Sequence, residues 1–217
     1  RNIKTAGNLK YFGEKLFKEK NKLNTSNKFK KFKIWCAAST HKSEEILIGR
    51  LHNNLKKIQK KLLTIIIPRH INRSKKIIND LQALDLKVIS HSSKEKLTYD
   101  TDIYLVDTFG ETSKFYNLTN VAFIGGSTIN HGGQNPLEAA RLGNYIISGS
   151  DTRNFTEIYA FLKKNKLSFT TDSISEMKKI ILKNINKKIL KKNREKIFNN
   201  GNKILKKNIF FINKYLA

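Results

Sequence analysis

The feature that most restricts the fold is a change of pattern at residue 32, where short apolar runs begin to alternate with amphipathic stretches. The apolar runs are residues 32–37, 62–67, 87–89, 103–106, 121–124, 145–147 and 167–169. Apolar residues recur at helical spacing in residues 43–60, 73–84, 112–118, 136–142, 154–164 and 174–185. Continuous apolar strands that alternate with helices predict a parallel sheet covered on both faces. Because parallel crossovers are right-handed, we expect an α/β fold with a Rossmann-like, doubly wound sheet.

Two segments of different composition flank this pattern. Residues 1–31 are charged, and we expect a linker that contains a helix over residues 9–20. Residues 186–217 are basic and periodic in Ile, Leu and Phe, which predicts one or two terminal helices packed on the sheet domain or on a partner domain. The Rossmann-like domain is then expected over residues 32–185. The chain begins with Arg1 and not with Met, so we expect it to be a piece of a longer protein.

The charge of the chain is strongly positive, with 43 Lys and Arg against 17 Asp and Glu and a formal net charge of +26. Such a surface attracts nucleic acid, anionic lipid headgroups or phosphorylated substrates. The abundance of Lys, Asn and Ile is equally typical of compositional drift, so the origin of the charge stays open. Arg is scarce beside Lys and forms no compact cluster, so no nucleic-acid partner is expected.

Polar and small residues follow the apolar runs at one expected edge of the sheet. In open α/β sheets, ligands bind beyond the carboxyl ends of the strands. The residues in question form five short stretches: Ser39-Thr40-His41, Pro68-Arg69-His70, Phe109-Gly110-Glu111, Gly125-Gly126-Ser127 and Asn135-Pro136-Leu137-Glu138. Loops that only connected elements would not need this concentration of Gly, Glu and Arg, and the pattern therefore predicts a ligand site.

Two charged residues of these loops are the main candidates for ligand contact. Asn135-Pro136 is a favourable helix start, which puts Glu138 in the first turn. Glu138 could accept the hydroxyls of a ribose there, although a carboxylate at this position also favours the helix dipole. Arg69 directly follows an apolar run, where a guanidinium can bind phosphate or carboxylate through two hydrogen bonds. Hydrogen-bonding roles are expected of three histidines in the same loops, His41, His70 and His131.

Other chemistries find little support in the sequence. No G-x-G-x-x-G fingerprint and no Walker loop is present. Asp100-Thr101-Asp102 matches the D-x-D metal signature of some glycosyltransferases, but it precedes a strand, so turn and cap chemistry is favoured. The histidines lack metal-ligand spacing, and the single Cys36 excludes a disulfide and is expected in the core. We therefore expect no metal site.

Taken in order, these segments resemble the signatures of the Kdo transferases, which transfer 3-deoxy-D-manno-octulosonic acid (Kdo) from CMP-Kdo. The matching segments are Thr5-Ala6-Gly7-Asn8-Leu9-Lys10, Ala38-Ser39-Thr40-His41 followed by Glu44-Glu45, Pro68-Arg69-His70, Asp107-Thr108-Phe109-Gly110-Glu111, Phe123-Ile124-Gly125-Gly126-Ser127 and Gly132-Gly133-Gln134-Asn135-Pro136-Leu137-Glu138. The resemblance runs to about Phe155 and is specific in order and spacing, whereas the basic tail matches only in being helical.

The resemblance implies the C-terminal half of a GT-B glycosyltransferase, in which two Rossmann-like domains face a cleft. The CMP contacts that it implies are Pro68, Arg69, Phe109, Gly110, Glu111, Asn135, Pro136, Leu137 and Glu138. Further contacts are expected from Ser39, Thr40, His41, His70, Gly125, Gly126 and Ser127. The catalytic base of the family is a Glu of the N-terminal domain, so no catalytic residue is expected here and the chain should be inactive alone. No metal or cofactor is implied, because CMP-Kdo is the donor substrate.

The implied partners are CMP-Kdo, a lipid A precursor as acceptor, the N-terminal domain and an anionic membrane surface. The implied place is the cytoplasmic face of the bacterial inner membrane, in lipopolysaccharide core biosynthesis, with an anchor in the N-terminal half. Two other functions stay open. Another GT-B enzyme, such as a UDP-sugar transferase or epimerase, would prefer UMP to CMP. A basic nucleic-acid-binding module would bind duplexes in a salt-dependent way and would not bind CMP.

Overall fold

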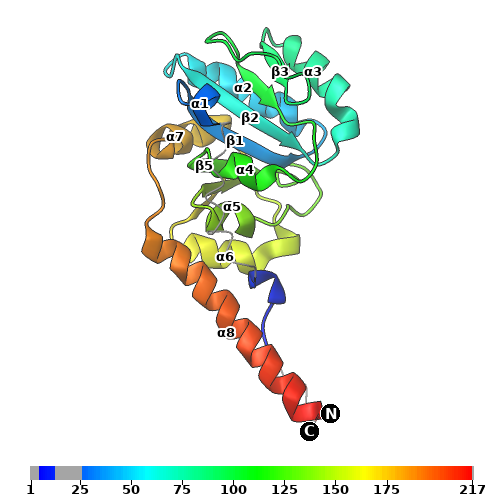
Figure 1. Cartoon of the computed structure of the whole chain (residues 1–217), viewed down its shortest axis with the longest axis vertical. Coiled ribbons are helices and arrows are strands. Elements are labelled where there is room, and N and C mark those ends of the chain that lie inside the picture. Colours follow the sequence, from blue (N-terminus) through cyan, green and yellow to red (C-terminus); the bar gives the residue numbers. More distant parts are fainter. Residues whose placement is uncertain (1–4, 13–25, 217) are drawn as a thin grey trace.

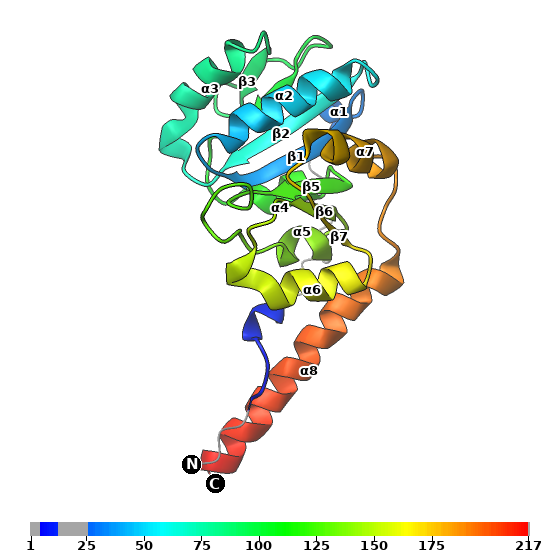
Figure 2. The ribbon, with the colours of Figure 1, turned by 180° about the vertical axis from the view of Figure 1, so that it is seen from behind.

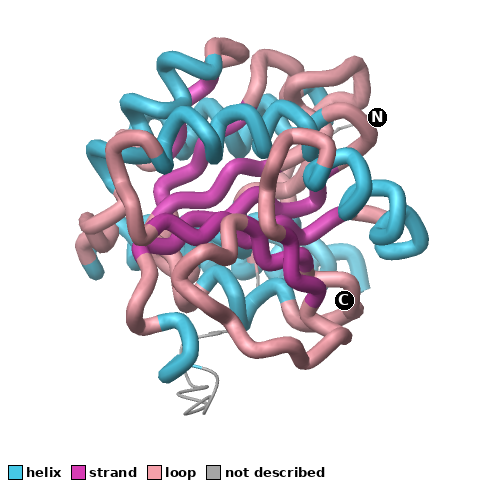
Figure 3. The backbone as a smooth tube through the Cα atoms, turned by 90° about the horizontal axis from the view of Figure 1, so that it is seen from above, coloured by secondary structure: helices cyan, strands magenta, loops and turns pink. Residues whose placement is uncertain are grey.

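The computed structural model of the protein describes residues 5–12 and 26–216, and its centre is a parallel sheet with helices on both faces (Figures 1 and 3). The strands are β1 (Lys33–Thr40), β2 (Leu62–Pro68), β3 (Val88–Ser90), β4 (Ile103–Leu105), β5 (Val121–Ile124), β6 (Tyr145–Ser148) and β7 (Ser168–Thr170). Their order across the sheet is β3-β4-β2-β1-β5-β6-β7, and neighbouring strands are parallel. The predicted Rossmann-like α/β class is confirmed.

The helices beyond residue 40 lie where the periodic stretches predicted them, whereas the short α1 lies in a segment that was predicted to be a linker. They are η1 (Leu9–Tyr11), α1 (Ser26–Phe29), α2 (Glu44–Lys56), η3 (Ile71–Arg73), α3 (Ser74–Gln82), α4 (Thr112–Tyr116), α5 (Leu137–Arg141), η4 (Arg153–Phe155), α6 (Thr156–Lys164), α7 (Ile174–Asn184) and α8 (Lys191–Leu216). Several end earlier than the apolar pattern does. Leu84 and Leu118 lie in turns beyond α3 and α4 but still pack on the core, which is why the pattern runs past both helices.

Both faces of the sheet are buried, as uniformly apolar strands predict. Successive side chains of β1 alternate between two cores. Trp35 and Ala37 pack with α2, α3 and α7, whereas Cys36 and Ala38 pack on the opposite face with α4, α5 and α6. The prediction that Cys36 is a core residue is confirmed, because it is fully buried and free.

The sheet reverses its direction of growth beside β1. From this central strand, β2, β4 and β3 extend to one side, and β5, β6 and β7 extend to the other. In open α/β sheets the loops at the carboxyl ends of two such strands diverge, and ligands bind in the crevice between them. The loops after β1 and β5 therefore lie at the place where this architecture forms ligand sites.

The end of β1 differs from the sequence prediction, which closed this apolar run at residue 37. The strand continues to Thr40, with a register irregularity between Ala38 and Thr40. Ser39 has a φ of 56°, in the left-handed region that non-glycine residues rarely adopt. Ser39 and Thr40 therefore belong to a kinked strand end and not to the loop that follows it.

The terminal helix α8 extends away from the sheet domain, and residues 5–12 run beside it (Figures 1 and 2). Lys207 Nζ donates to the carbonyl oxygen of Thr5 at 2.8 Å, and Arg141 Nη2 donates to the carbonyl oxygen of Tyr11 at 2.5 Å. Of the helix predicted over residues 9–20, η1 is present and the part beyond residue 12 lies outside the described residues. The domain division at residues 31 and 185 stays a prediction. No helix in residues 5–12 and 26–216 has both the length and the apolar character of a membrane span.

Candidate functional site

Three loops bring their histidines together at the carboxyl edge of the sheet. His41 follows β1, His70 follows β2, and His131 lies in the loop after β5. The ring centres of His41 and His131 are 4.2 Å apart, and those of His41 and His70 are 5.9 Å apart. The predicted meeting of these loops at one edge is therefore present in the structure, while ligand contact by the histidines stays a prediction.

Gln134 connects two members of this histidine cluster. Its Nε2 atom lies 3.3 Å from Nε2 of His41 and 3.2 Å from Nε2 of His131. Burial, followed by the neighbouring charge of His131, lowers the pKa of His41. His41 is therefore neutral at neutral pH, and a neutral imidazole can donate one hydrogen bond and accept another.

Arg69 is exposed directly beyond β2. Its backbone amide donates to the carbonyl oxygen of Thr40 at 2.9 Å, which fixes the residue beside the end of β1. Among the described residues, no hydrogen bond or ion pair engages its guanidinium. A free guanidinium at this edge can bind phosphate or carboxylate through two parallel hydrogen bonds.

Glu138 lies in the first turn of α5, which begins at Leu137, one residue later than predicted, with Pro136 and not Asn135 at the N-cap position. The side chain of Asn135 accepts a hydrogen bond from the amide of Leu137 at 3.0 Å in the turn that leads into the helix. Glu138 is half-buried. Burial raises the pKa of Glu138, and the charge of Arg141 offsets this only in part. Within the part of the chain that the structure describes, no hydrogen bond holds this carboxylate, so its charge is partly desolvated without a close partner.

The loop after β4 presents an exposed aromatic ring. Phe109 is 78% exposed, and the following Gly110 has a φ of +80°. Glu111 is already engaged, because its Oε2 lies 2.7 Å from His91 Nε2 and its other oxygen pairs with Lys114. The hydrogen bond from Lys114 lowers the pKa of Glu111. Phe109 and Gly110 are therefore the exposed residues of this loop, and the exposed ring of Phe109 can stack on a nucleotide base.

Three of the predicted contact residues have buried side chains. The Thr40 hydroxyl is fully buried and donates to Glu45 Oε1 at 3.0 Å. The Ser127 hydroxyl is fully buried and donates to the carbonyl oxygen of Ile124 at 2.6 Å. Leu137 is a fully buried core residue. These side chains support the loops, and ligand contact through the backbone of these residues stays a prediction. The rings of two further predicted residues are buried too, namely Pro68 and Pro136.

Glycine is required at Gly125 and Gly126 for close packing. A Cβ atom at Gly125 would collide with the carbonyl oxygen of Ser39. A Cβ atom at Gly126, where φ is +68°, would lie 2.9 Å from His131 Cδ2 and 3.3 Å from His41 Cδ2. The loop after β5 is therefore pressed against the end of β1 and against the histidine cluster.

A buried carboxylate at the start of α2 holds this arrangement, and the sequence analysis gave it no role. Glu44 is only 1% exposed. Its Oε2 accepts hydrogen bonds from the amides of His41 at 2.9 Å and Gly126 at 2.7 Å. Its Oε1 accepts from the amides of Ser127 at 3.1 Å and Thr128 at 3.2 Å, and from the Thr128 hydroxyl at 2.9 Å. One carboxylate thus joins the loops after β1 and β5.

The neighbouring Glu45 is buried as well and has a different set of partners. Arg73 donates from Nη1 to Oε1 and from Nη2 to Oε2, both at 3.0 Å. The signal for both acids was the pair Glu44-Glu45 directly after Ser39-Thr40-His41. In the sequence this pair contributed only to the family resemblance, because no local pattern shows which backbone amides a buried acid will meet.

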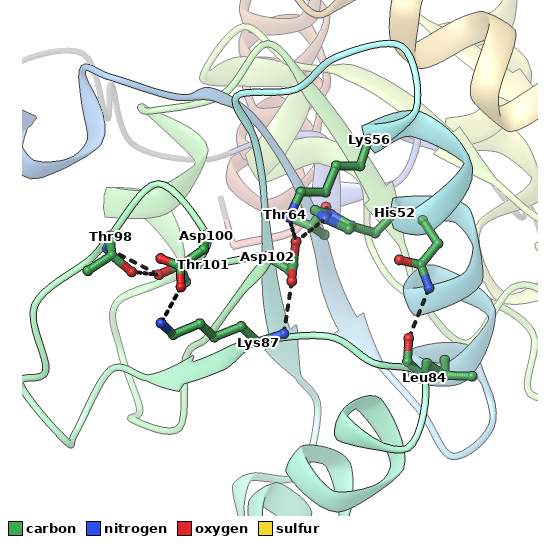
Figure 4. Close-up of polar contacts among 10 residues, drawn as sticks. His52, Lys56, Thr64, Leu84, Lys87, Thr98, Asp100, Thr101 and Asp102 are labelled. Atoms are coloured by element: carbon green, nitrogen blue, oxygen red, sulfur yellow. Dashed lines mark hydrogen bonds and ion pairs between the residues drawn. The ribbon is translucent and has the colours of Figure 1, made fainter.

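Asp102, from the D-x-D motif, lies in a buried network directly before β4 (Figure 4), at the amino end of the strand and not at the carboxyl edge. His52 is fully buried, with Nε2 at 3.1 Å from Asp102 Oδ1 and Nδ1 at 2.8 Å from Thr64 Oγ1. Lys56 pairs with the same aspartate oxygen, and the amide of Lys87 donates to Asp102 Oδ2 at 2.9 Å. The favoured structural explanation of the motif holds for Asp102.

Asp100 differs from Asp102 because it lies at the surface, paired with Lys87 Nζ at 2.5 Å. The turn chemistry predicted for this segment is confirmed, since the Thr101 amide donates to the carbonyl oxygen of Thr98 at 3.1 Å. In the described part of the chain, no group of three or more His, Cys, Asp or Glu side chains is arranged to hold a metal ion.

Similarity to known proteins agrees with this architecture. No protein-family model matches the chain. The chain is 30% identical over 213 residues to 3-deoxy-D-manno-octulosonic acid transferase of Haemophilus influenzae, covering 95% of this chain and 48% of that protein. It is 32% identical over 217 residues to the enzyme of the same name from Rickettsia typhi, covering 97% of this chain and 47% of that protein. The crystal structure of the C-terminal CMP-Kdo binding domain of WaaA from Acinetobacter baumannii superposes with a TM-score of 0.68 at 26% identity, covering 81% of this chain and 90% of that one.

The chain resembles Kdo transferases over nearly its whole length. It spans about half the length of the curated relatives that it matches. The resemblance extends further than the sequence segments indicated, which ended at about Phe155. The matched region covers 95% of the chain and so includes most of the basic tail, residues 186–217. The predicted Rossmann-like fold with terminal helices is confirmed, and it is similar to the fold of the C-terminal CMP-Kdo binding domain of WaaA.

Proposed function

We propose that this chain is the donor-binding half of a Kdo transferase and binds CMP-Kdo. The observation that carries the proposal is its likeness, over 90% of the solved domain, to the C-terminal CMP-Kdo binding domain of WaaA. The site residues fit such a donor by their chemistry. Arg69 offers a free guanidinium for an anionic group, Phe109 offers an exposed ring for the base, and Glu138 offers a carboxylate for the ribose.

The proposed reaction needs a second domain. A general base of an N-terminal GT-B domain takes the proton of an acceptor hydroxyl on a lipid A precursor. The acceptor oxygen then bonds to the anomeric carbon of Kdo, the bond from that carbon to the CMP phosphate oxygen breaks, and its electron pair leaves with CMP. Arg69 stabilises the charge on the departing phosphate. We propose no metal or cofactor in this step and no catalytic residue in this chain.

Binding of CMP by Arg69 variants tests this function. We expect Arg69→Lys to weaken CMP about tenfold, because the ammonium keeps the charge but loses the planar pair of donors, and Arg69→Ala to weaken it further. Isothermal titration of the chain with CMP and UMP measures both effects. Arg50→Ala is the matched control, since it removes one exposed positive charge from α2 and should leave CMP affinity unchanged.

The other outcomes of this titration separate the competing functions. Unchanged CMP affinity in both Arg69 variants would remove Arg69 from the site. Tighter binding of UMP than of CMP would favour another GT-B enzyme that uses a UDP-sugar. Binding of duplex nucleic acid that weakens with salt, without any CMP binding, would favour the nucleic-acid-binding alternative.

We also propose that the protein works at the cytoplasmic face of the bacterial inner membrane and that the basic tail contacts anionic lipid. Six exposed lysines support this proposal: Lys187, Lys188, Lys191, Lys192, Lys206 and Lys207. Exposed apolar side chains lie among them, namely Leu190, Ile209, Phe210 and Ile212. Basic side chains interleaved with apolar ones are typical of segments that lie on an anionic bilayer.

Co-sedimentation with vesicles tests the membrane contact. We expect replacement of Lys188 and Lys206 by Gln to weaken binding to anionic vesicles about thirtyfold, since each lysine near such a surface contributes about 1 kcal/mol. Replacement of the exposed Lys75 and Lys179 by Gln removes the same charge from other helices and should have little effect. Equal binding of the unaltered chain to neutral and anionic vesicles at low salt would refute the proposal.

A further inference from the structure

The loops after β1 and β5 form a cup of backbone amides that already contains an anion of the protein itself. The amides of His41, Gly126, Ser127 and Thr128 all point at the carboxylate of Glu44, with N–O distances between 2.7 and 3.2 Å. Cups of successive amides of this kind bind phosphate and other anions in many nucleotide sites. Their position here, between β1 and β5, is also where open α/β sheets place ligands.

Burial makes the Glu44 carboxylate a permanent occupant of this amide cup. Its exposed fraction is 1%, and both of its oxygens are engaged, by two donors on one side and three on the other. A phosphate could enter only by expelling a charged side chain that already satisfies these amides. The amides in turn would be buried without acceptors if the carboxylate left, which costs free energy for each of them.

We propose that Glu44 is a positioning residue that fills the amide cup, fixes the loop after β5 against the histidine cluster, and excludes the donor phosphate from these amides. The phosphate of the donor is then bound by side chains at the rim, with Arg69 as the exposed cation beside the end of β1. The role of Arg69 in binding the donor phosphate rests on the proposed CMP-Kdo function. The occupancy of the amide cup by Glu44 is independent of that function.

Rescue by added anions tests the occupancy of the cup. Glu44→Ala should lower the melting temperature of the chain and leave the amide cup open. Sodium formate or phosphate, compared with sodium chloride at equal ionic strength, should then raise the melting temperature of this variant. The rise should be roughly 3–6 °C at about ten times the dissociation constant of the anion. The unaltered chain should show no such rise.

Glu45→Ala is the matched control for this experiment. Glu45 is adjacent, equally buried and ion-paired, but its partners are Arg73 and Thr40 and not the amides of the cup. Its loss should destabilise the fold without creating a response specific to formate or phosphate. An equal anion response in both variants, or none in Glu44→Ala, would overturn the proposal. Both results are independent of CMP binding. The proposed function is tested separately, by titration of the Arg69 variants with CMP.

A measurement on the unaltered chain keeps the proposal testable if Glu44→Ala does not fold. The amide resonances of Gly126, Ser127 and Thr128 should be protected from hydrogen exchange and should not shift on addition of inorganic phosphate. CMP should perturb the side-chain resonance of Arg69 while these amides stay protected. Direct phosphate-induced shifts and loss of protection at the three amides would mean that the cup accepts external anions, and the proposal would be wrong.

Discussion

Replacing Asp102 by Ala is expected to lower the free energy of unfolding by roughly 2–6 kcal/mol, since two buried donors lose their acceptor and each such loss costs about 1–3 kcal/mol. The loss arises from the buried donors that remain without an acceptor when the aspartate is removed. His52 is fully buried and would lose the partner of its Nε2 atom, and the amide of Lys87 would lose its acceptor. Urea denaturation followed by circular dichroism measures the change.

Asp100→Ala is the control for this prediction, because it removes an acid of the same motif that lies at the surface. The Lys87–Asp100 pair is exposed, and pairs of that kind contribute about 0–1 kcal/mol. Similar losses for the two variants would contradict the buried network as the role of Asp102. A loss of bound divalent metal in either variant would revive the metal interpretation of the motif.

The pH dependence of stability gives the Asp102 prediction a second measurement. Burial alone would raise the pKa of Asp102, but hydrogen bonds from His52, Lys56 and the amide of Lys87 bring it below its usual value. A carboxyl whose pKa is lower in the folded state stabilises the protein above its unfolded pKa, about 3.9, and this stabilisation is lost as pH falls through the folded pKa. The difference between the unaltered chain and Asp102→Ala should therefore shrink in acid.

The fold could be predicted from the sequence because burial on both faces leaves uniformly apolar strands. Trp35 and Cys36 are adjacent and point into opposite cores, so the run shows no alternation and indicates a covered parallel sheet. The end of β1 could not be predicted in the same way. Ser39 and Thr40 are polar, and only the kink at Ser39 and the bond from Thr40 to Glu45 explain why both still belong to the strand.

The edge at which the loops meet could be predicted from the sequence, but their packing could not. The order of strands and loops places His41, His70 and His131 at one edge even though the end of β1 was set too early. Their packing around Gly126 depends on tertiary contacts that no local pattern records. The same holds for Glu44, because a first-turn acid that only meets the helix dipole and one that accepts five hydrogen bonds look identical in sequence.

Glu138→Gln is expected to weaken CMP binding by roughly 1–3 kcal/mol, or about 5–150-fold, while it leaves the fold equally stable or more stable at neutral pH. Binding weakens because the amide replaces charge-assisted hydrogen bonds to the ribose by neutral ones. The equal or higher stability of the Gln variant follows from the raised pKa of Glu138. At neutral pH the unaltered chain must ionise a partly desolvated carboxyl, which costs stability, whereas Gln carries no charge. A carboxyl with a raised folded pKa loses stability as pH rises through that pKa, and Gln has no such loss. The stability advantage of Gln should therefore vanish in acid, below about pH 4.

The matched control for Glu138 is Glu157, an exposed acid in the first turn of α6. Glu157→Gln loses only the favourable interaction with the helix dipole, so stability should fall by about 0.3–1 kcal/mol and CMP affinity should stay the same. If Glu138 served only the start of α5, its variant would behave like this control, with intact CMP affinity and a lower melting temperature. Calorimetric titration with CMP and thermal melting of both variants decide between the two roles. A desolvated carboxylate that costs stability is expected where a ligand supplies its partner, and opposite signs in binding and stability would identify Glu138 as that residue.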